Sequence, residues 1–68
     1  MELSARNQIR GTVKSVRHGA VMSEVIVDVG GQEVVAAITR RSAEALEARE
    51  GAELVVVIKA TDVMLARP

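Results

Sequence analysis

The chain has 68 residues, with nine Lys or Arg against nine Asp or Glu, no cysteine and one histidine. Balanced charge argues against nucleic-acid or acidic-membrane binding, and the missing cysteines exclude disulfides and thiolate metal sites. A domain of this size buries only about 60% of its unfolded surface, and one histidine is too few for a His-based metal site. Association between copies is therefore the expected source of additional stability.

Hydrophobic residues make up 49% of the chain, yet none is Phe, Trp or Tyr. The core must be built from Val, Ile, Leu, Ala and Met, and subunit interfaces would supply the rest of the buried area. The start, MELSARNQ, has no apolar run after a basic segment, so no signal peptide is predicted. No apolar stretch approaches the roughly 20 residues of a membrane span. We expect a cytoplasmic protein with no membrane partner.

The first predicted strand covers residues 8–16, where apolar and polar residues alternate. Gly11 inside it indicates a bulge or a close backbone approach. Val16 falls out of the alternation, which predicts a bulge near Ser15. A turn is expected over residues 17–20.

The second strand is predicted over residues 21–29, with Val21, Ser23, Val25, Val27 and Val29 on one face. The Gly-Gly pair at residues 30–31 predicts a tight hairpin, and residues 32–38 form the returning strand.

A short helix follows the third strand. Thr39 is expected to cap it, it continues through about Ala48, and Gly51 ends the following turn.

The last two predicted strands cover residues 53–60 and residues 63–66. The first of them, ELVVVIKA, is apolar on both faces, which predicts barrel core on one side and another subunit on the other. The whole pattern predicts one all-β domain over residues 1–68, a small five-stranded OB-like Greek-key barrel with one short helix, assembling as an oligomer.

Neither catalysis nor nucleic-acid binding is predicted. His18 is expected to be a solvated residue of a turn, and Ser/His/Asp catalysis needs three groups that converge in a pocket. Four carboxylates fall along the helix and the turn after it and indicate a solvated face: Glu44, Glu47, Glu50 and Glu53. OB barrels that bind single strands use aromatic platforms, which this chain lacks, and the Arg40-Arg41 pair is expected to be surface charge.

Anion binding has positive support. A small oxyanion needs converging backbone amides, hydroxyls and cations. The segment SARN supplies Ser4, Arg6 and Asn7, KATD (residues 59–62) supplies a cation and a hydroxyl, and HGAV (residues 18–21) supplies amides at a glycine turn. Each segment alone is equally well explained as surface charge or turn chemistry.

Three stretches, SARNQIRGTV, HGAVMSEVIVDVGG and EGAELVVVIKATDVML, closely resemble the molbindins, small molybdenum-binding proteins built from a single Mop or TOBE domain. The resemblance implies an OB-like barrel that binds molybdate, and tungstate similarly, without an organic cofactor. It also implies a homohexamer, a trimer of dimers, with oxyanion sites between subunits. The residues that match the family's binding segments are Ser4, Ala5, Arg6 and Asn7, then Lys59, Ala60 and Thr61 facing them across an interface, and Gly19, Ala20 and Val21 near the symmetry axes.

The expected function is therefore binding, storage and homeostasis of molybdate and tungstate in the cytoplasm. A site made only of donors suits a fully deprotonated dianion, and sulfate must be excluded by size. Two alternatives remain: a ligand-free structural oligomerisation module, and an accessory domain that senses molybdate.

Overall fold

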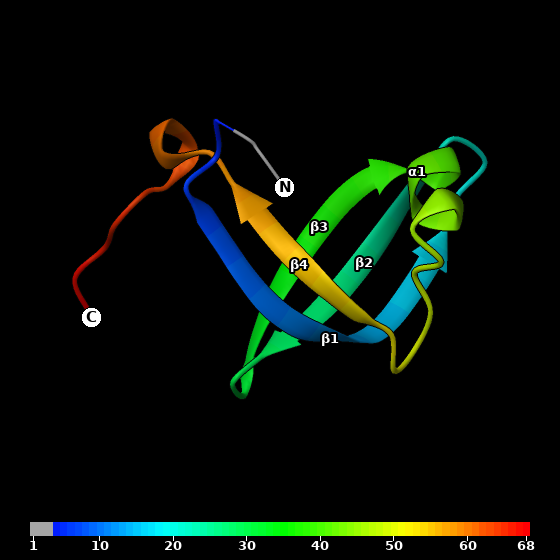
Figure 1. Ribbon diagram of the computed structural model, residues 1–68, viewed down its shortest axis with the longest axis horizontal. Coiled ribbons are helices and arrows are strands. Elements are labelled where there is room, and N and C mark those ends of the chain that lie inside the picture. The colour runs from blue at the N-terminus through cyan, green and yellow to red at the C-terminus, as the bar shows by residue number, and fades with distance from the viewer. Residues whose placement is uncertain (1–3) are drawn as a thin grey trace.

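Four antiparallel strands form the sheet of the computed structural model, which describes residues 4–68 (Figure 1). They are β1 (Asn7–His18), β2 (Met22–Val29), β3 (Gln32–Thr39) and β4 (Glu53–Ile58). Their order is β3-β2-β1-β4. Three hairpin-connected strands with a fourth returning beside the first are a Greek key, so the predicted topology and the mostly β class are confirmed.

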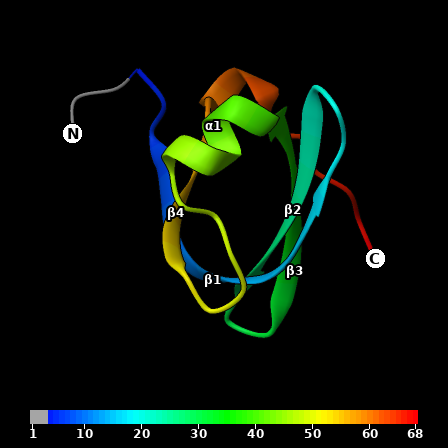
Figure 2. The same ribbon diagram turned by 90° about the vertical axis from the view of Figure 1, so that its right-hand side faces the viewer.

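The long strand β1 bends where one residue is inserted into its ladder with β2. Val13 lies opposite Val27, but Ser15 lies opposite Ile26, so Lys14 is the extra residue. This confirms the bulge predicted near Ser15. Beyond the bulge Val16 again turns to the inner face, and the bend lets one strand serve both halves of the curled sheet (Figure 2).

Gly11 marks the predicted close approach of two backbones. A Cβ at this position would lie 2.6 Å from Val27 Cγ1 and 2.8 Å from the Asp28 carbonyl oxygen. No larger residue fits here without displacing β2.

The β2–β3 hairpin forms as predicted. Gly30 and Gly31 have φ angles of 57° and 87°, the two positive values that a type I′ turn requires. The Asp28 carboxylate also accepts a hydrogen bond from the Gly31 amide at 3.1 Å. The turn predicted over residues 17–20 is partly wrong, because Arg17 and His18 still pair with β2 at the end of β1.

Helix α1 (Arg40–Ala45) begins as predicted and ends earlier. The Thr39 hydroxyl accepts a hydrogen bond from the Ser42 amide at 3.1 Å, which is the expected N-cap. At the other end the Glu47 amide donates to the Glu44 carbonyl and the Ala48 amide to the Ala43 carbonyl. This pair of bonds is a Schellman motif, so the prediction of a helix through Ala48 is wrong.

The two predicted C-terminal strands differ most from expectation. Strand β4 ends at Ile58, and a single 3-10 turn, η1 (Ala60–Asp62), follows it. Residues 63–66 form no strand within the chain that the structure describes, so the prediction of a fifth strand is wrong. The reason is that this turn carries the tail away from the sheet, and no edge of the same chain lies beside it (Figures 1 and 2).

The core is small and lies inside the curl, beneath α1, which covers one end of the sheet (Figure 2). Five buried side chains form it: Val13, Val25, Val27, Ala43 and Ala48. The inner face of β4 packs against them through Leu54 and Val56. The outer face of the same strand leaves Val55 and Val57 about two-fifths exposed, at 42% and 41%.

Among residues 4–68, no helix is both long enough and apolar enough to cross a membrane.

Candidate oxyanion site

The segments SARN and KAT meet at the end of the sheet opposite α1 (Figure 1). The β1–β4 ladder ends with Asn7 opposite Ile58. The Asn7 side chain reinforces this last pair, because its Nδ2 donates to the Ile58 carbonyl at 3.1 Å. Arg6 and Lys59 are the next residues outward from this last pair, so both lie at the same end of the sheet.

The turn before β1 is also held in place. Gln8 Nε2 donates to the Ala5 carbonyl at 3.1 Å, which folds residues 5–8 back on themselves. Ala5 and Asn7 are half-buried, whereas Ser4 and Arg6 are exposed. The two buried positions therefore anchor the segment, and the two exposed ones are free to reach a ligand.

Electrostatics at this end favour an anion. Within residues 4–68 the ion pairs are Lys14–Glu33 and Arg40–Glu44, and neither Arg6 nor Lys59 has a carboxylate partner there. Two cations without carboxylate partners at one end of the sheet repel each other. An anion between them reverses the sign of this term, and the exposed hydroxyls of Ser4 and Thr61 add neutral donors.

The third predicted segment, residues 19–21, lies at the opposite end of β1. Twelve strand residues separate it from Arg6, about 40 Å of chain at 3.3 Å per residue. Although β1 bends, its two ends lie on opposite sides of the sheet (Figure 1). One copy therefore cannot bring the Gly19 turn and the Arg6–Lys59 pair to the same ion.

The Gly19 turn offers fewer free donors than its sequence suggested. The Gly19 amide already donates to the Met22 carbonyl at 2.7 Å, and a Cβ at Gly19 would lie 2.7 Å from the same oxygen. No hydrogen bond within the described residues occupies the amides of Ala20 and Val21. Those two amides are the donors that remain for a ligand.

Arg40, which the sequence predicts to be surface charge, is hydrogen-bonded to this turn. Its backbone amide donates to the Val21 carbonyl at 2.8 Å, and its Nη1 donates to the Gly19 carbonyl at 3.4 Å. Arg40 and Arg41 line a shallow hollow together with Ala20 and Val21. The signal that could have found this contact is the pairing of β2 with β3, which brings Met22 opposite Thr39.

His18 closes β1 rather than standing free in a turn. Its Nδ1 lies 2.6 Å from the Ser23 hydroxyl, and Ser23 is only 2% exposed. No carboxylate among residues 4–68 is hydrogen-bonded to the imidazole. Ser23 and His18 are residue types that can serve as nucleophile and base. The Ser23 hydroxyl is buried, however, so a substrate cannot reach it. The four carboxylates predicted to form a solvated face are exposed, which confirms that reading.

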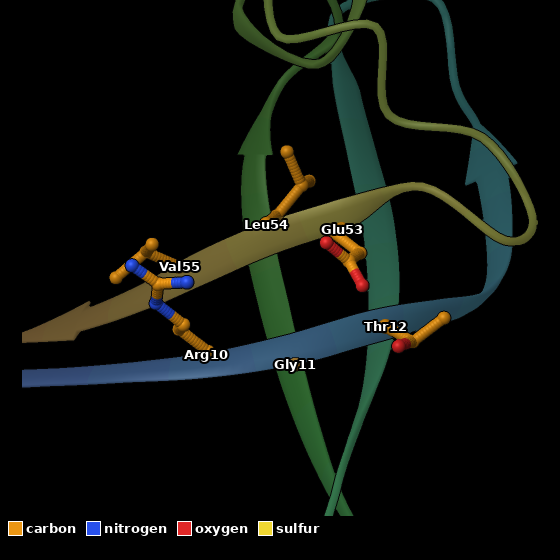
Figure 3. Close-up of a pocket in the computed structure, with 6 residues that line it drawn as sticks. All are labelled: Arg10, Gly11, Thr12, Glu53, Leu54 and Val55. Atoms are coloured by element: carbon orange, nitrogen blue, oxygen red, sulfur yellow. The ribbon is translucent and has the colours of Figure 1, made fainter.

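A second hollow lies along the β1–β4 ladder, around Gly11 and the residues that flank it on both strands (Figure 3). Arg10 and Val55 stand at one end of it, and Thr12 and Glu53 at the other. The Glu53 carboxylate would repel a dianion, so this hollow is not a suitable oxyanion site. A direct metal site is also not indicated, because residues 4–68 hold no cluster of three His, Asp or Glu side chains.

Comparison with known proteins identifies the family of this domain. The model of the TOBE domain matches residues 3–65. The chain belongs to the TOBE domain family. This TOBE domain is 47% identical over 66 residues to the molybdenum-pterin-binding protein 3 of Clostridium pasteurianum, a match that covers 96% of this chain and 97% of that protein.

Solved structures agree with the sequence relatives. The molybdate-binding protein of Sporomusa ovata superimposes with a TM-score of 0.92 at 36% identity, covering 98% of this chain and all of that one. The cytoplasmic molybdate-binding protein ModG, in a form with molybdate bound, superimposes with a TM-score of 0.83 at 43% identity, covering 88% of this chain and 43% of that one. The predicted family and its architecture are confirmed.

Proposed function

We propose that this TOBE domain binds molybdate, and tungstate alike, at sites formed between copies of a homo-oligomer. It stores these oxyanions in the cytoplasm and buffers their concentration, and it catalyses no reaction. One observation carries the proposal: the β1–β4 ladder ends at Asn7 and Ile58, so the SARN and KAT segments leave the sheet at the same end, and neither Arg6 nor Lys59 has a carboxylate partner within residues 4–68. The relatives, named as molybdate-binding or molybdenum-pterin-binding proteins, support the choice of ligand.

The oxyanion site takes its donors from the segments that the sequence singled out. Ser4, Arg6 and Asn7 supply a hydroxyl, a guanidinium and the second N–H of an amide, and Ala5 supplies backbone. Lys59, Ala60 and Thr61 lie at the same end of each copy, and in the oligomer they face the SARN segment of a neighbouring copy across the interface. A further set of sites near the symmetry axes uses the turn of Gly19, Ala20 and Val21, where the last two amides have no hydrogen-bond acceptor within residues 4–68.

Association between copies follows from the size of the core and the spread of the donors. Within residues 4–68 the core holds only five buried hydrophobic side chains, and Val55 and Val57 remain partly exposed on a strand that is apolar on both faces. The homohexamer, arranged as a trimer of dimers, covers this face and brings donors from several chains to each ion. Oxyanion binding then stabilises the assembly by mass action.

Selectivity against phosphate follows from the chemistry of the donors. Molybdate at neutral pH is a tetrahedral dianion without a proton. Hydrogen phosphate carries one, and a site with donors only leaves that proton unpaired, at a cost of about 1–3 kcal/mol. Sulfate has no such proton, so the size of the cavity between copies must exclude it.

Native mass spectrometry, followed by calorimetric titration of molybdate, tests this proposal. The expected result is an oligomer that gains discrete molybdate masses and gains none from equal concentrations of sulfate. Arg6→Ala and Lys59→Ala should each weaken molybdate binding about 10- to 100-fold, the effect of one charge-assisted hydrogen bond worth roughly 1.5–3 kcal/mol.

Arg49→Ala is the matched control, because Arg49 is an exposed arginine in the loop before β4, at the other end of that strand from Lys59. It removes the same charge and should leave the affinity unchanged. An oligomer that stays empty in molybdate would contradict the proposal and favour a ligand-free structural module. Equal losses in the Arg6 and Arg49 variants would show a general effect of charge rather than a site.

A further inference from the structure

One residue of α1 holds the Gly19 turn at two of its carbonyl groups. The backbone amide of Arg40 donates to the Val21 carbonyl at 2.8 Å, and Nη1 of the same arginine donates to the Gly19 carbonyl at 3.4 Å. The turn and the start of α1 therefore lie side by side at this end of the sheet (Figure 1). Because Arg40 contacts both carbonyls, it controls how the turn presents its other backbone groups.

The bond to Gly19 sets the direction of an amide that the turn offers. A trans peptide unit is planar, so the carbonyl of one residue and the N–H of the next point in opposite directions. Residues 4–68 contain no cis peptide bond. The Gly19 carbonyl points toward Arg40, so the Ala20 N–H points away from it. The following peptide unit, which carries the Val21 N–H, lies between the two carbonyls that Arg40 holds.

The two ends of the turn are fixed separately, by the β1–β2 ladder. The Gly19 amide donates to the Met22 carbonyl at 2.7 Å, and His18 Nδ1 lies 2.6 Å from the Ser23 hydroxyl. Ser23 is buried, so this second contact is anchored in the core. The ladder therefore fixes where the turn begins and ends, and Arg40 fixes the direction of the peptide units between.

Arg40 is poorly placed to be a cation for the ligand itself. Its Nε lies 3.8 Å from Glu44 Oε1, and its Nη1 is engaged with the Gly19 carbonyl. Glu44 also lines the hollow on this side of the turn, where its carboxylate would repel a dianion. The Ala20 amide faces the opposite way, so an oxyanion would meet the turn on the side away from Arg40.

We propose that Arg40 is a positioning residue, which orients the amides of Ala20 and Val21 toward a small tetrahedral oxyanion without touching it. The inference rests on the proposed function, in which this turn is one of the oxyanion sites, and deepens it by naming the residue that prepares the site. Amides that are ordered before the ligand arrives lose little conformational freedom on binding, so the restraint raises the affinity.

Arg40→Ala removes the guanidinium and little else. The backbone bond from residue 40 to Val21 remains, and alanine favours the helix that begins here. In ¹⁵N relaxation measurements without ligand, the order parameters of the Ala20 and Val21 amides should fall from about 0.85 toward 0.6. The molybdate affinity that these two amides report should fall about 3- to 10-fold, the effect of one ordinary hydrogen bond. The affinity reported by the Lys59 amide should stay unchanged.

Arg41→Ala is the matched control. Arg41 lines the same hollow and carries the same charge, but it forms no hydrogen bond or ion pair within residues 4–68. Its loss should leave the turn ordered. Any effect of its charge on affinity should vanish in about 0.5 M salt, where the Debye length is ~4 Å, whereas the effect of Arg40→Ala should persist. Equal and persistent losses in both variants, or an Arg40→Ala turn as ordered as that of the parent, would overturn the proposal.

The parent protein gives a second test, even if Arg40→Ala fails to fold. Molybdate should shift the amide resonances of Ala20 and Val21 most. It should leave the Gly19 amide, which is bonded to Met22, and the Arg40 Nε–H almost unshifted. A larger shift at the Arg40 side chain than at the two amides would show direct contact with the anion and would reject the positioning role.

The same spectra separate this inference from the proposed function. If molybdate shifts neither amide in the parent while Arg40→Ala loosens the turn, the oxyanion role of the turn fails and the restraint by Arg40 stands. If molybdate shifts both amides with the same affinity in the parent and in Arg40→Ala, the function stands and the positioning role fails.

Discussion

Replacing Gly11 by alanine should destabilise the domain through one added methyl group. The backbone at Gly11 is outside the left-handed region, so alanine can adopt it and should gain about 0.4–1 kcal/mol from a less flexible unfolded chain. Against this, the Cβ would meet Val27 Cγ1 at 2.6 Å, the Asp28 carbonyl oxygen at 2.8 Å and Val29 Cγ2 at 3.0 Å. Two of these contacts are closer than real Cβ atoms show, and one is to backbone. Overpacking of this kind costs about 1–3 kcal/mol, so the steric term should win.

The net loss should be about 1–2 kcal/mol, or roughly 4–15 °C in the melting temperature of a domain of this size. Urea unfolding followed by circular dichroism measures it, since a chain without Phe, Trp or Tyr has no aromatic fluorescence. Repeating the urea unfolding at a second protein concentration separates folding from association, because only association depends on concentration. The double variant Gly11→Ala/Val27→Ala removes the closest contact, so the two losses should add to more than the loss of the double variant. A Gly11→Ala protein as stable as the parent, or strictly additive losses, would refute the steric argument.

Three other substitutions test single features of the fold. Thr39→Ala removes the cap of α1 and should lower the free energy of unfolding by about 1 kcal/mol in the same urea assay, whereas Thr39→Ser should restore it. Glu47→Gly should raise that free energy by up to about 1 kcal/mol, because Glu47 has a φ of 55° that glycine adopts without strain; a loss would contradict this. The hydrogen bond and charge of Glu33 raise the pKa of Lys14, so the stability from this pair is present at neutral pH and is lost as the pH rises through the raised pKa. Both side chains are largely exposed, so Lys14→Met should leave the urea midpoint almost unchanged at pH 7, and a large shift there would contradict this view of the pair.

The local elements were predictable because their causes are local. The Gly30-Gly31 pair specifies a tight turn, and the alternation on either side of it sets which face of the hairpin is buried. The bulge near Ser15 was readable because Val16 breaks the alternation while remaining apolar. Each of these signals depends on residues within a few positions of one another.

The helix end was not predictable, because its usual marker is missing. Helices that end in a Schellman motif usually place glycine in the left-handed position, and here Glu47 occupies it. The motif is held by Ala43 and Ala48, which are both buried in the core. Tertiary packing of two alanines therefore overrides the preference of a glutamate, and the sequence SAEALEAR gives no sign of it.

The place of the oxyanion segments and of the tail depends on contacts between residues far apart in the sequence, so local patterns could not give it. The ladder brings the SARN and KAT segments to one end of the sheet but leaves the Gly19 turn at the far end of a 12-residue strand. Residues 63–66 have the apolar composition that is typical of a strand, but no edge of the described chain lies beside them. A domain whose core holds five buried hydrophobic side chains within residues 4–68, and whose Met64, Leu65, Val55 and Val57 are exposed, would gain from association what its core does not supply. If each oxyanion site takes donors from more than one copy, then adding molybdate should strengthen assembly, and diluting the protein should weaken molybdate binding by the same linkage. Sedimentation of the parent across a dilution series, with and without molybdate, measures both effects, and assembly that ignores the anion would show that the two are separate.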